Sequence, residues 1–408
     1  MDLFSSNYRN FNEIYLYVEK YCPDKKEVLV DFMDSNELNL FTNIAFLRQD
    51  NEKPTMILFR NYNLKPLREG SYYRLSKDVI NQIMELGLLR NVADSLLVGF
   101  VVDLDSRVKQ LFDKTKTFTP EERFFYRIDQ GQYEQLPNLN LQMEGTTQII
   151  IKNVGQGSWN EIIVNEQPKL IFDIGTIYTT NSHEIKSKSS QRNDAYQKAK
   201  PTLIVSHWDV DHYHYLLGLT DNTIASFSNF ICRSTVPNLT CRKVIGRFRT
   251  LNNNSLIILS PEPANPPHPK SSMHLKEYTL TKNRQYLFFN GSVNRSRNKS
   301  GIGLLLRKPG RSIIFPGDYD YLQISNYMLP HLGYRHEHFL VVPHHGGKAG
   351  KFIYQSNKKC ILKDAIVSVG KNPYKPSHPH TQNLNDLKMA GFNLIRTDYI
   401  KSDYKLFI

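Results

Sequence analysis

The strongest constraint on the fold of this chain is one short segment, Leu203–His212, in which an apolar run leads directly into a cluster of polar side chains. Four potential metal ligands lie within six positions: His207, Asp209, Asp211 and His212. In extended backbone, positions 207, 209 and 211 face one side, and a turn adds the fourth. Imidazoles and carboxylates gathered at the end of a buried strand need a compensating cation. The segment therefore predicts a site for Zn²⁺, Mn²⁺ or Fe²⁺ rather than a solvated loop.

The same order of apolar strand, turn and ligand-type side chain recurs further along the chain. The residues concerned are Asp318 after Ser312–Phe315, His344 and His345 after Phe339–Val342, and His378 and His380 after Lys375–Ser377. Because these groups follow strands in the same way as the first cluster, we expect them to meet on one rim of a β scaffold. The rim could then hold one metal ion, or two ions that share ligands.

Charge and histidine content divide the chain into two parts. Residues 1–150 carry 18 Lys+Arg and 22 Asp+Glu, a net charge of −4, whereas residues 151–408 carry 34 and 17, a net charge of +17. All 13 histidines lie between His183 and His380. We therefore predict an N-terminal α+β domain over residues 1–145 and a basic domain over 146–408. A basic domain attracts polyanions such as nucleic acid.

The N-terminal part shows no chemical motif, and its apolar patterns predict mixed α and β structure. Helices are predicted over Asn12–Tyr21 and over Leu75–Leu89, where Ser76 would cap the second one. Strands are predicted over Pro54–Phe59 and Leu96–Asp103. A domain of this kind is more typical of a docking or regulatory module, which predicts a protein partner for residues 1–145.

After residue 146, short β-rich runs alternate with Gly turns, and few helices are predicted. The strands are Gln148–Val154, Glu161–Val164, Lys169–Ile174, Leu203–Ser206, Leu256–Leu259, Gln285–Phe289, Ile302–Arg307, Ser312–Phe315, Phe339–Val342 and Asp364–Val369. The helices lie near Asn193–Lys200, Tyr213–Leu219, Tyr321–Leu332 and Gln382–Ala390. This pattern favours a two-sheet α/β sandwich over a doubly wound sheet, in which a helix would follow each strand.

Several classes of protein are disfavoured by simple features of the sequence. No apolar run reaches the ~18 residues of a membrane span, and the start lacks the basic and apolar regions of a signal peptide. The four cysteines form no CxxC pair, so a disulfide scaffold and a Cys-based zinc finger are not expected. We predict a cytoplasmic protein with no membrane partner.

On these motifs, residues 146–408 resemble the metallo-β-lactamase superfamily. Its H-x-H-x-D-H signature occurs here as H-x-D-x-D-H, with Asp209 in place of the second His, which is similar to the hydrolase domain of ComEC-type DNA-internalisation proteins. Five further segments match that domain in order: Lys152–Gly157, Leu170–Gly175, Asn298–Leu306 with Pro316–Asp318, Val342–Gly347, and Ser368–Asn372 with Ser377–Pro379. The resemblance implies an α/β metallo-β-lactamase αββα sandwich with an additional N-terminal α+β domain.

The sequence also departs from the family pattern. Lys152 and Asn153 stand where D-V-G-Q-G begins, Gly347 replaces the Ser of H-H-G-S, and Ser377 replaces the Gly of G-H-P. No histidine outside a Pro-rich loop lies between Leu219 and Asp318 to supply the third motif. Asp209 in place of His makes the ligand set harder, which shifts the metal preference from Zn²⁺ toward Mn²⁺.

The resemblance implies a cofactor of two divalent metal ions, zinc or manganese, and a role for each matched residue. His207 and Asp209 would bind one ion, Asp211 and His212 the second, Asp318 would bridge both, and His344 would complete the second site. Asp211 would also orient or deprotonate the nucleophilic water, while His345 and His378 would contact a phosphate or protonate the leaving oxygen. Whether His344 or His345 is the ligand stays open. Asp173 is expected to hold adjacent loops by hydrogen bonds.

The leading functional prediction is a nuclease or phosphodiesterase that cleaves DNA through a bridging hydroxide. The net charge of +17 supports it, as do basic and aromatic side chains in the predicted rim loops. The predicted substrate contacts are Arg297, Lys348, Lys371 and Asn372. Because a cytosolic nuclease needs restraint, we also predict a protein partner and a role as an effector of a bacterial defence system.

Two alternatives stay open at this stage. The first is a small-molecule hydrolase that acts on a cyclic nucleotide, a thioester or a lactam, since the superfamily fold supports many reactions. The second is a regulated effector subunit whose site is gated by a partner. The opposite charges of the two parts of the chain motivate this second alternative.

Overall fold

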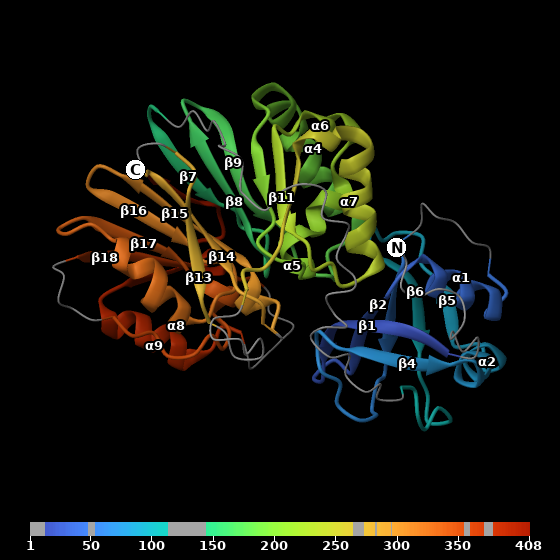
Figure 1. Ribbon diagram of the computed structural model, residues 1–408. Coiled ribbons are helices and arrows are strands. Elements are labelled where there is room, and N and C mark those ends of the chain that lie inside the picture. The colour runs from blue at the N-terminus through green and yellow to red at the C-terminus, as the bar shows by residue number, and fades with distance from the viewer. Residues whose placement is uncertain are drawn as a thin grey trace. The chain divides into compact units, whose positions relative to one another are not determined.

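The computed structural model describes residues 13–47, 54–112, 144–263, 273–281, 284–294, 296–354, 360–370 and 378–408 (Figure 1). The chain divides into unit 1, Met1–Glu122 with Pro237–Lys243, and unit 2, Arg123–Val236 with Val244–Ile408. The predicted domain boundary after residue 145 lies beside residues 113–143, which are outside the described residues, and it stays a prediction.

The described residues of unit 1 form one six-stranded sheet and two helices. In sheet order the strands are β4 (Tyr72–Ser76), β1 (Glu13–Cys22), β2 (Glu27–Phe32), β3 (Met56–Arg60), β6 (Val98–Asp103) and β5 (Leu89–Asn91). Only β3 and β6 pair in parallel; the other pairs are antiparallel. Helix α1 (Ser35–Ile44) begins at Asp34, whose carboxylate accepts from two backbone N–H groups, and α2 (Lys77–Glu85) begins at Ser76.

The helix predicted over Asn12–Tyr21 is wrong, because this segment forms strand β1. Ile14, Leu16 and Val18 are fully buried in the core of unit 1, and this spacing has the period of two that a strand requires. β1 pairs with both β2 and β4, so tertiary pairing decides between two patterns that the short segment allows. The other three predicted elements of this region are confirmed as β3, α2 and β6.

Unit 2 contains two seven-stranded sheets. The first has the order β12 (Leu256–Leu259), β11 (Asn229–Arg233), β10 (Thr202–Ile204), β9 (Gln167–Ile174), β8 (Trp159–Val164), β7 (Thr147–Ile151) and β20 (Tyr404–Phe407). The second has the order β13 (Leu275–Thr279), β14 (Tyr286–Gly291), β15 (Ile302–Lys308), β16 (Arg311–Phe315), β17 (Glu337–Val341), β18 (Ile361–Val367) and β19 (Asn393–Arg396). All ten strands predicted for this part of the chain are present.

The two sheets pack face to face, and helices cover their outer faces (Figure 1). Between the sheets, Phe172 of β9 meets Phe315 of β16 with ring centroids 5.8 Å apart. Among the described residues, the α-helices of unit 2 are α4 (Ser182–Ala199), α5 (Val210–Tyr213), α6 (Asp221–Ser226), α7 (Leu239–Asn252, whose first five residues belong to unit 1), α8 (Tyr321–Gln323), α9 (Thr381–Ala390) and α10 (Thr397–Ile400). Phe230 of β11 stacks on Phe248 of α7 at 3.9 Å. The outer face of the second sheet packs in one cluster with residues of α8 and α9. Unit 2 is thus an α/β sandwich of the predicted αββα order.

The topology brings the ends of several strands to the site. β9, β10 and β11 run parallel in the first sheet, and β16, β17 and β18 run parallel in the second. Carboxyl ends of parallel strands share one edge of a sheet, where ligand sites are commonly built. Asp173 at the end of β9 and the loops after β10, β16 and β17 supply the candidate site residues. Among the described residues, no helix has the length and apolar character needed to cross a membrane.

Candidate metal centre

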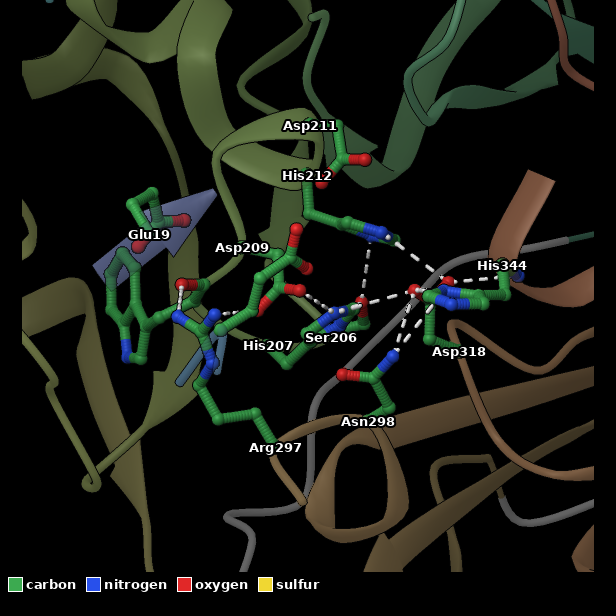
Figure 2. Close-up of polar contacts among 12 residues, drawn as sticks. Glu19, Ser206, His207, Asp209, Asp211, His212, Arg297, Asn298, Asp318 and His344 are labelled. Atoms are coloured by element: carbon green, nitrogen blue, oxygen red, sulfur yellow. Dashed lines mark hydrogen bonds and ion pairs between the residues drawn. The ribbon is translucent and has the colours of Figure 1, made fainter. Parts of the chain in front are cut away.

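Five predicted site residues come together in two overlapping groups, and Figure 2 shows four of them: His207, Asp211, His212 and Asp318. The first group contains His207, His212 and Asp318, and the second contains Asp211, His212 and His345. The segment after β10 supplies three of the five, and Asp318 and His345 follow β16 and β17 of the other sheet. Residues that follow strands of both sheets therefore lie together in the described part of the chain, as the sequence predicted.

The spacing of the ligand-type atoms fits a cation. Asp318 directs one oxygen to each of two imidazoles: Oδ1 lies 3.4 Å from His212 Nε2, and Oδ2 lies 3.7 Å from His207 Nε2. In the second group, Asp211 Oδ2 lies 3.4 Å from His345 Nε2. The three Nε2 atoms are buried and have no hydrogen-bond partner among the described residues. Ligand bonds of about 2.0–2.2 Å place neighbouring donors about 3.3–3.6 Å apart around a tetrahedral ion. The donor set therefore suits divalent metal ions.

The other nitrogen of each imidazole is fixed by a neighbouring group. His212 Nδ1 bonds Asp173 Oδ2 at 2.8 Å, His207 Nδ1 contacts Ser206 Oγ at 3.0 Å, and His345 Nδ1 bonds the carbonyl oxygen of Ser368 at 3.1 Å. Such contacts fix the tautomer and orient Nε2 toward a metal. Asp173 also accepts from the backbone N–H of Ser206 at 2.7 Å, which agrees with its predicted role in holding loops. The orienting roles of Ser206 and Ser368 were not predicted, although both residues stand at strand ends or within the matched motifs.

The site concentrates negative charge. Burial alone would lower the pKa of His212, but the carboxylates of Asp173 and Asp318 more than offset burial and raise this pKa well above its usual value. Burial would raise the pKa of Asp318, yet the imidazoles of His212 and His344 hold it well below its usual range. Asp318 is thus ionised and contacts two imidazoles. A divalent cation bound beside this carboxylate would be stabilised by the same negative charge.

The backbone is strained at three of these positions. Asp173, His344 and His345 adopt φ values of 59°, 55° and 51°, in the left-handed region that non-glycine residues rarely occupy. Gly317, at φ 56°, forms the turn that places Asp318, and a Cβ there would lie 3.0 Å from the Cβ of Ser206. Strained residues of this kind cluster at functional sites, where the surrounding structure holds them.

The two neighbouring histidines take different places. His345 lies with Asp211 and His212, whereas His344 lies outside both groups. The backbone N–H of His344 donates to Asp318 Oδ1 at 3.0 Å, and its Nδ1 lies 2.7 Å from Oδ2. Asn298 Nδ2 lies 3.3 Å from the same Nδ1. The geometry thus favours His345 as the candidate ligand and places His344 beside Asp318, whereas the sequence analysis gave His344 the ligand role and left the choice between the two histidines open. The sequence could not decide which histidine is the ligand, because the positions of the two rings depend on two consecutive residues with left-handed backbone.

Asp209, predicted as a ligand, belongs to neither group. Its Oδ1 lies 2.9 Å from the guanidinium of Arg297, and its Oδ2 lies 3.6 Å from His207 Nε2. Arg297 also donates to the carbonyl oxygen of Trp208 at 2.6 Å. Although burial opposes ionisation, Arg297 and His207 lower the pKa of Asp209. Arg297, which was predicted to contact substrate, is thus paired with Asp209 in this structure.

The remaining predicted residues lie nearer the surface or outside the part of the chain that the structure describes. The ring of His378 lies 5.0 Å from that of His344, and a Cβ on Gly347 would lie 2.4 Å from His378 Nε2. Gly347, which replaces the Ser of the family motif, therefore makes room for His378. Lys348 is exposed. Lys371 and Asn372 lie outside the described residues.

Comparisons with known proteins add little to this description. No protein-family model matches the chain, and no curated protein matches it. Among solved structures, the chain is similar to the metallo-β-lactamase fold protein YhfI from Bacillus subtilis, with 9% sequence identity and a TM-score of 0.37 over 65% of this chain and 100% of that chain. A similarity this weak supports no conclusion about this chain. The fold is therefore described from the sheets of the chain itself, and the proposed function is argued from its candidate site.

Proposed function

We propose that this chain is a metal-dependent hydrolase with two neighbouring divalent ions. The observation that supports it most is the set of three buried imidazole nitrogens without hydrogen bonds, arranged beside the carboxylates of Asp211 and Asp318. Leaving buried polar atoms unpaired costs about 1–3 kcal/mol each, which bound cations would offset. The two oxygens of Asp318, each facing a different imidazole, suit a bridging carboxylate.

Each residue then has a role that its contacts support. His207 and Asp318 would hold one ion, with Asp209 beside them, and Asp211, His212 and His345 would hold the other. When bound, such ions lower the pKa of a coordinated water toward 7 and neutralise charge on the substrate. Asp211, which is only partly buried, would orient that water and accept its proton. His344, whose Nδ1 lies 2.7 Å from Asp318 Oδ2, would protonate a leaving oxygen, with the ring of His378 beside it.

We propose a phosphodiester of DNA as the substrate. The net charge of +17 over residues 151–408 favours a polyanion, and Lys348 and Lys351 are exposed cations in the segment that follows His345. We also propose a role in bacterial defence and a protein partner for residues 1–145, because a cytosolic nuclease must be kept inactive until it is needed. Small-molecule hydrolysis is the competing function that the experiment below separates from this one.

The test is incubation of the purified protein with linear and circular DNA in Mn²⁺ or Zn²⁺, beside the double variant Asp211→Ala/His212→Ala. We expect the wild type to cleave DNA and the variant to lose at least about 10³-fold in rate, since the second ion position loses two of its three grouped ligands. Electrophoresis of the products gives the rate. If the wild type binds two metal ions but cleaves neither DNA, the proposed substrate is wrong and small phosphodiesters, thioesters and lactams are the next substrates.

The assignment of the two histidines predicts different effects of their substitution. His345→Ala is expected to remove about one equivalent of metal per chain, because Nε2 of His345 belongs to the second group. His344→Ala is expected to keep both equivalents and to lose about 10²–10⁴-fold in rate, the usual contribution of a general acid. The metal content of the two variants after dialysis, measured by inductively coupled plasma mass spectrometry, distinguishes the two assignments. Loss of metal in His344→Ala with retention in His345→Ala would reverse the assignment.

A further inference from the structure

The two ion positions of the proposed metal centre differ in how many protein ligands they have. The second position has a group of three, Asp211, His212 and His345, whereas only His207 and Asp318 remain for the first position. Catalytic zinc sites usually have three protein ligands besides the bound water. With the grouped residues alone, the first position therefore lacks one protein ligand, which a further carboxylate beside it would supply.

Asp209 lies beside the first position without joining it. Its Oδ2 is 3.6 Å from His207 Nε2, which matches the separation of about 3.3–3.6 Å between neighbouring ligand atoms around a tetrahedral ion. Asp209 nevertheless belongs to neither group. Its Oδ1 lies 2.9 Å from the guanidinium of Arg297 but has no hydrogen-bond partner among the described residues. The carboxylate of Asp209 is thus held by the charge of Arg297 rather than by a directed hydrogen bond to Oδ1.

Arg297 sets a fixed positive charge next to the first position. Figure 2 shows Asp209 between the guanidinium of Arg297 and the imidazole of His207. Arg297 also donates to the carbonyl oxygen of Trp208 at 2.6 Å, which keeps the guanidinium beside Asp209. An arginine does not lose its proton in proteins, so a divalent ion that approaches Asp209 is repelled by this charge. Arg297 and a metal ion therefore compete for the same carboxylate.

The side chain of Arg297 is also accessible to a substrate. It is 18% exposed, and Arg297 lies between β14 and β15, directly before the short helix η3 (Asn298–Ser300). A guanidinium binds phosphate through two parallel hydrogen bonds, a stronger contact than a single ion contact to one carboxylate oxygen. A phosphate of the substrate would therefore be able to replace Asp209 as the partner of Arg297.

We propose that Arg297 competes with a divalent ion for Asp209 and releases Asp209 when it binds a phosphate of the substrate. Asp209 would then turn toward His207 and complete the first position, which reaches its full metal affinity only beside a bound phosphodiester. The second position does not depend on this exchange. Arg297 is a positioning residue in this scheme, because it acts on the metal through Asp209. This role rests on the proposed function, since it describes the regulation of the same metal centre.

Calorimetric titration of Mn²⁺ into the full chain, after removal of metal with EDTA, tests the competition. We expect the wild type to show a tight and a weak binding event, and Arg297→Ala to tighten the weak event about 10–100-fold, the usual size of effect for a partner of a metal ligand. The tight event should stay unchanged in this variant, which also shows that the site is still folded. Arg297→Lys keeps the positive charge and should lie closer to the wild type than to Arg297→Ala.

Dimethyl phosphate, a phosphodiester anion that resists hydrolysis, tests the exchange. When it is added before Mn²⁺, the weak event of the wild type should tighten several-fold relative to sodium chloride of equal ionic strength. Arg297→Ala should show no such change, because its Asp209 is already released. Equal effects of dimethyl phosphate on the wild type and on Arg297→Ala would overturn the proposed exchange.

Lys299→Ala is the matched control. It removes a cation two positions further along, which pairs with Asp320 rather than with Asp209, and it should titrate like the wild type. Two Mn²⁺ events that Arg297→Ala leaves unchanged would refute the role of Arg297 alone. Absence of Mn²⁺ binding to the wild type would refute the proposed metal centre and this role with it, so the two failures are distinguishable.

Discussion

Asp318→Asn is expected to remove both metal ions and to abolish hydrolysis. The side chain is almost fully buried, and its two oxygens face His212 and His207 at 3.4 and 3.7 Å. Asparagine keeps the volume but replaces one oxygen with an NH₂ group and removes the negative charge, so neither ion position retains its shared ligand. We expect metal content to fall from about two ions to less than one per chain, and the rate to fall at least about 10³-fold.

Metal analysis after dialysis, together with the DNA cleavage assay, measures both effects. The comparison with Asp211→Ala/His212→Ala is informative, because that variant leaves His207 and Asp318 in place and should keep part of the metal. Asp320→Ala is the matched control, since Asp320 follows two positions later and pairs with Lys299 rather than with the site histidines. Full metal content in Asp318→Asn would refute the bridging role.

The positions of ten strands and the meeting of the candidate ligands on one rim could be predicted from the sequence, because most of these residues follow an apolar strand. Very short strands gave no such signal: β20 (Tyr404–Phe407) and β19 (Asn393–Arg396) have four residues each, too few to show a period, and pair with β7 and β18. The segment of β1 was predicted as a helix because Ile14, Tyr15, Tyr17 and Val18 have a spacing that a helix also allows. Pairing with a strand on each side decided the outcome. The local pattern of apolar residues predicts a strand poorly when the strand is stabilised mainly by packing against neighbouring strands.

Within the site, residue identity was predictable but its precise use was not. Arg297 and Asp209 lie 88 positions apart in the chain, so their ion pair depends on the fold rather than on any spacing. The different positions of His344 and His345 depend on two consecutive left-handed residues, a conformation that neither side chain favours. Sequence motifs therefore identified the residues of the candidate site, whereas backbone geometry decides which of their atoms lie close together.

Asp31→Ala is expected to produce the largest loss of stability in unit 1. Asp31 lies in β2, is fully buried, and accepts from three groups at 2.8 Å: the N–H of Thr240, the hydroxyl of Thr55 and the N–H of Phe32. Thr240 lies in the first turn of α7 and belongs to unit 1. Alanine would leave these buried donors without an acceptor, at a cost of about 1–3 kcal/mol each. We expect a total loss of about 3–5 kcal/mol.

Asp31→Asn separates the charge of this carboxyl group from its hydrogen bonds. Burial raises the pKa of Asp31, and its hydrogen bonds lower it only in part. A carboxyl group with a raised pKa in the fold stabilises the fold below the unfolded pKa of about 3.9, and that contribution is lost as the pH rises through the folded pKa. Asparagine cannot ionise, so the variant should be less stable than the wild type near pH 4 and lose less stability as the pH increases.

Thermal unfolding followed by circular dichroism, with hydrogen exchange at the amides of β1 and β2, measures both variants. A loss of this size should lower the melting temperature of the transition of unit 1 by about 12–20 °C in Asp31→Ala. Asp24→Ala, in the exposed turn before β2, should change it by less than about 2 °C, because exposed substitutions are usually within about 0.5 kcal/mol. Melting of Asp31→Ala at the wild-type temperature, or identical pH profiles for wild type and Asp31→Asn, would show that this carboxylate does not hold the start of α7.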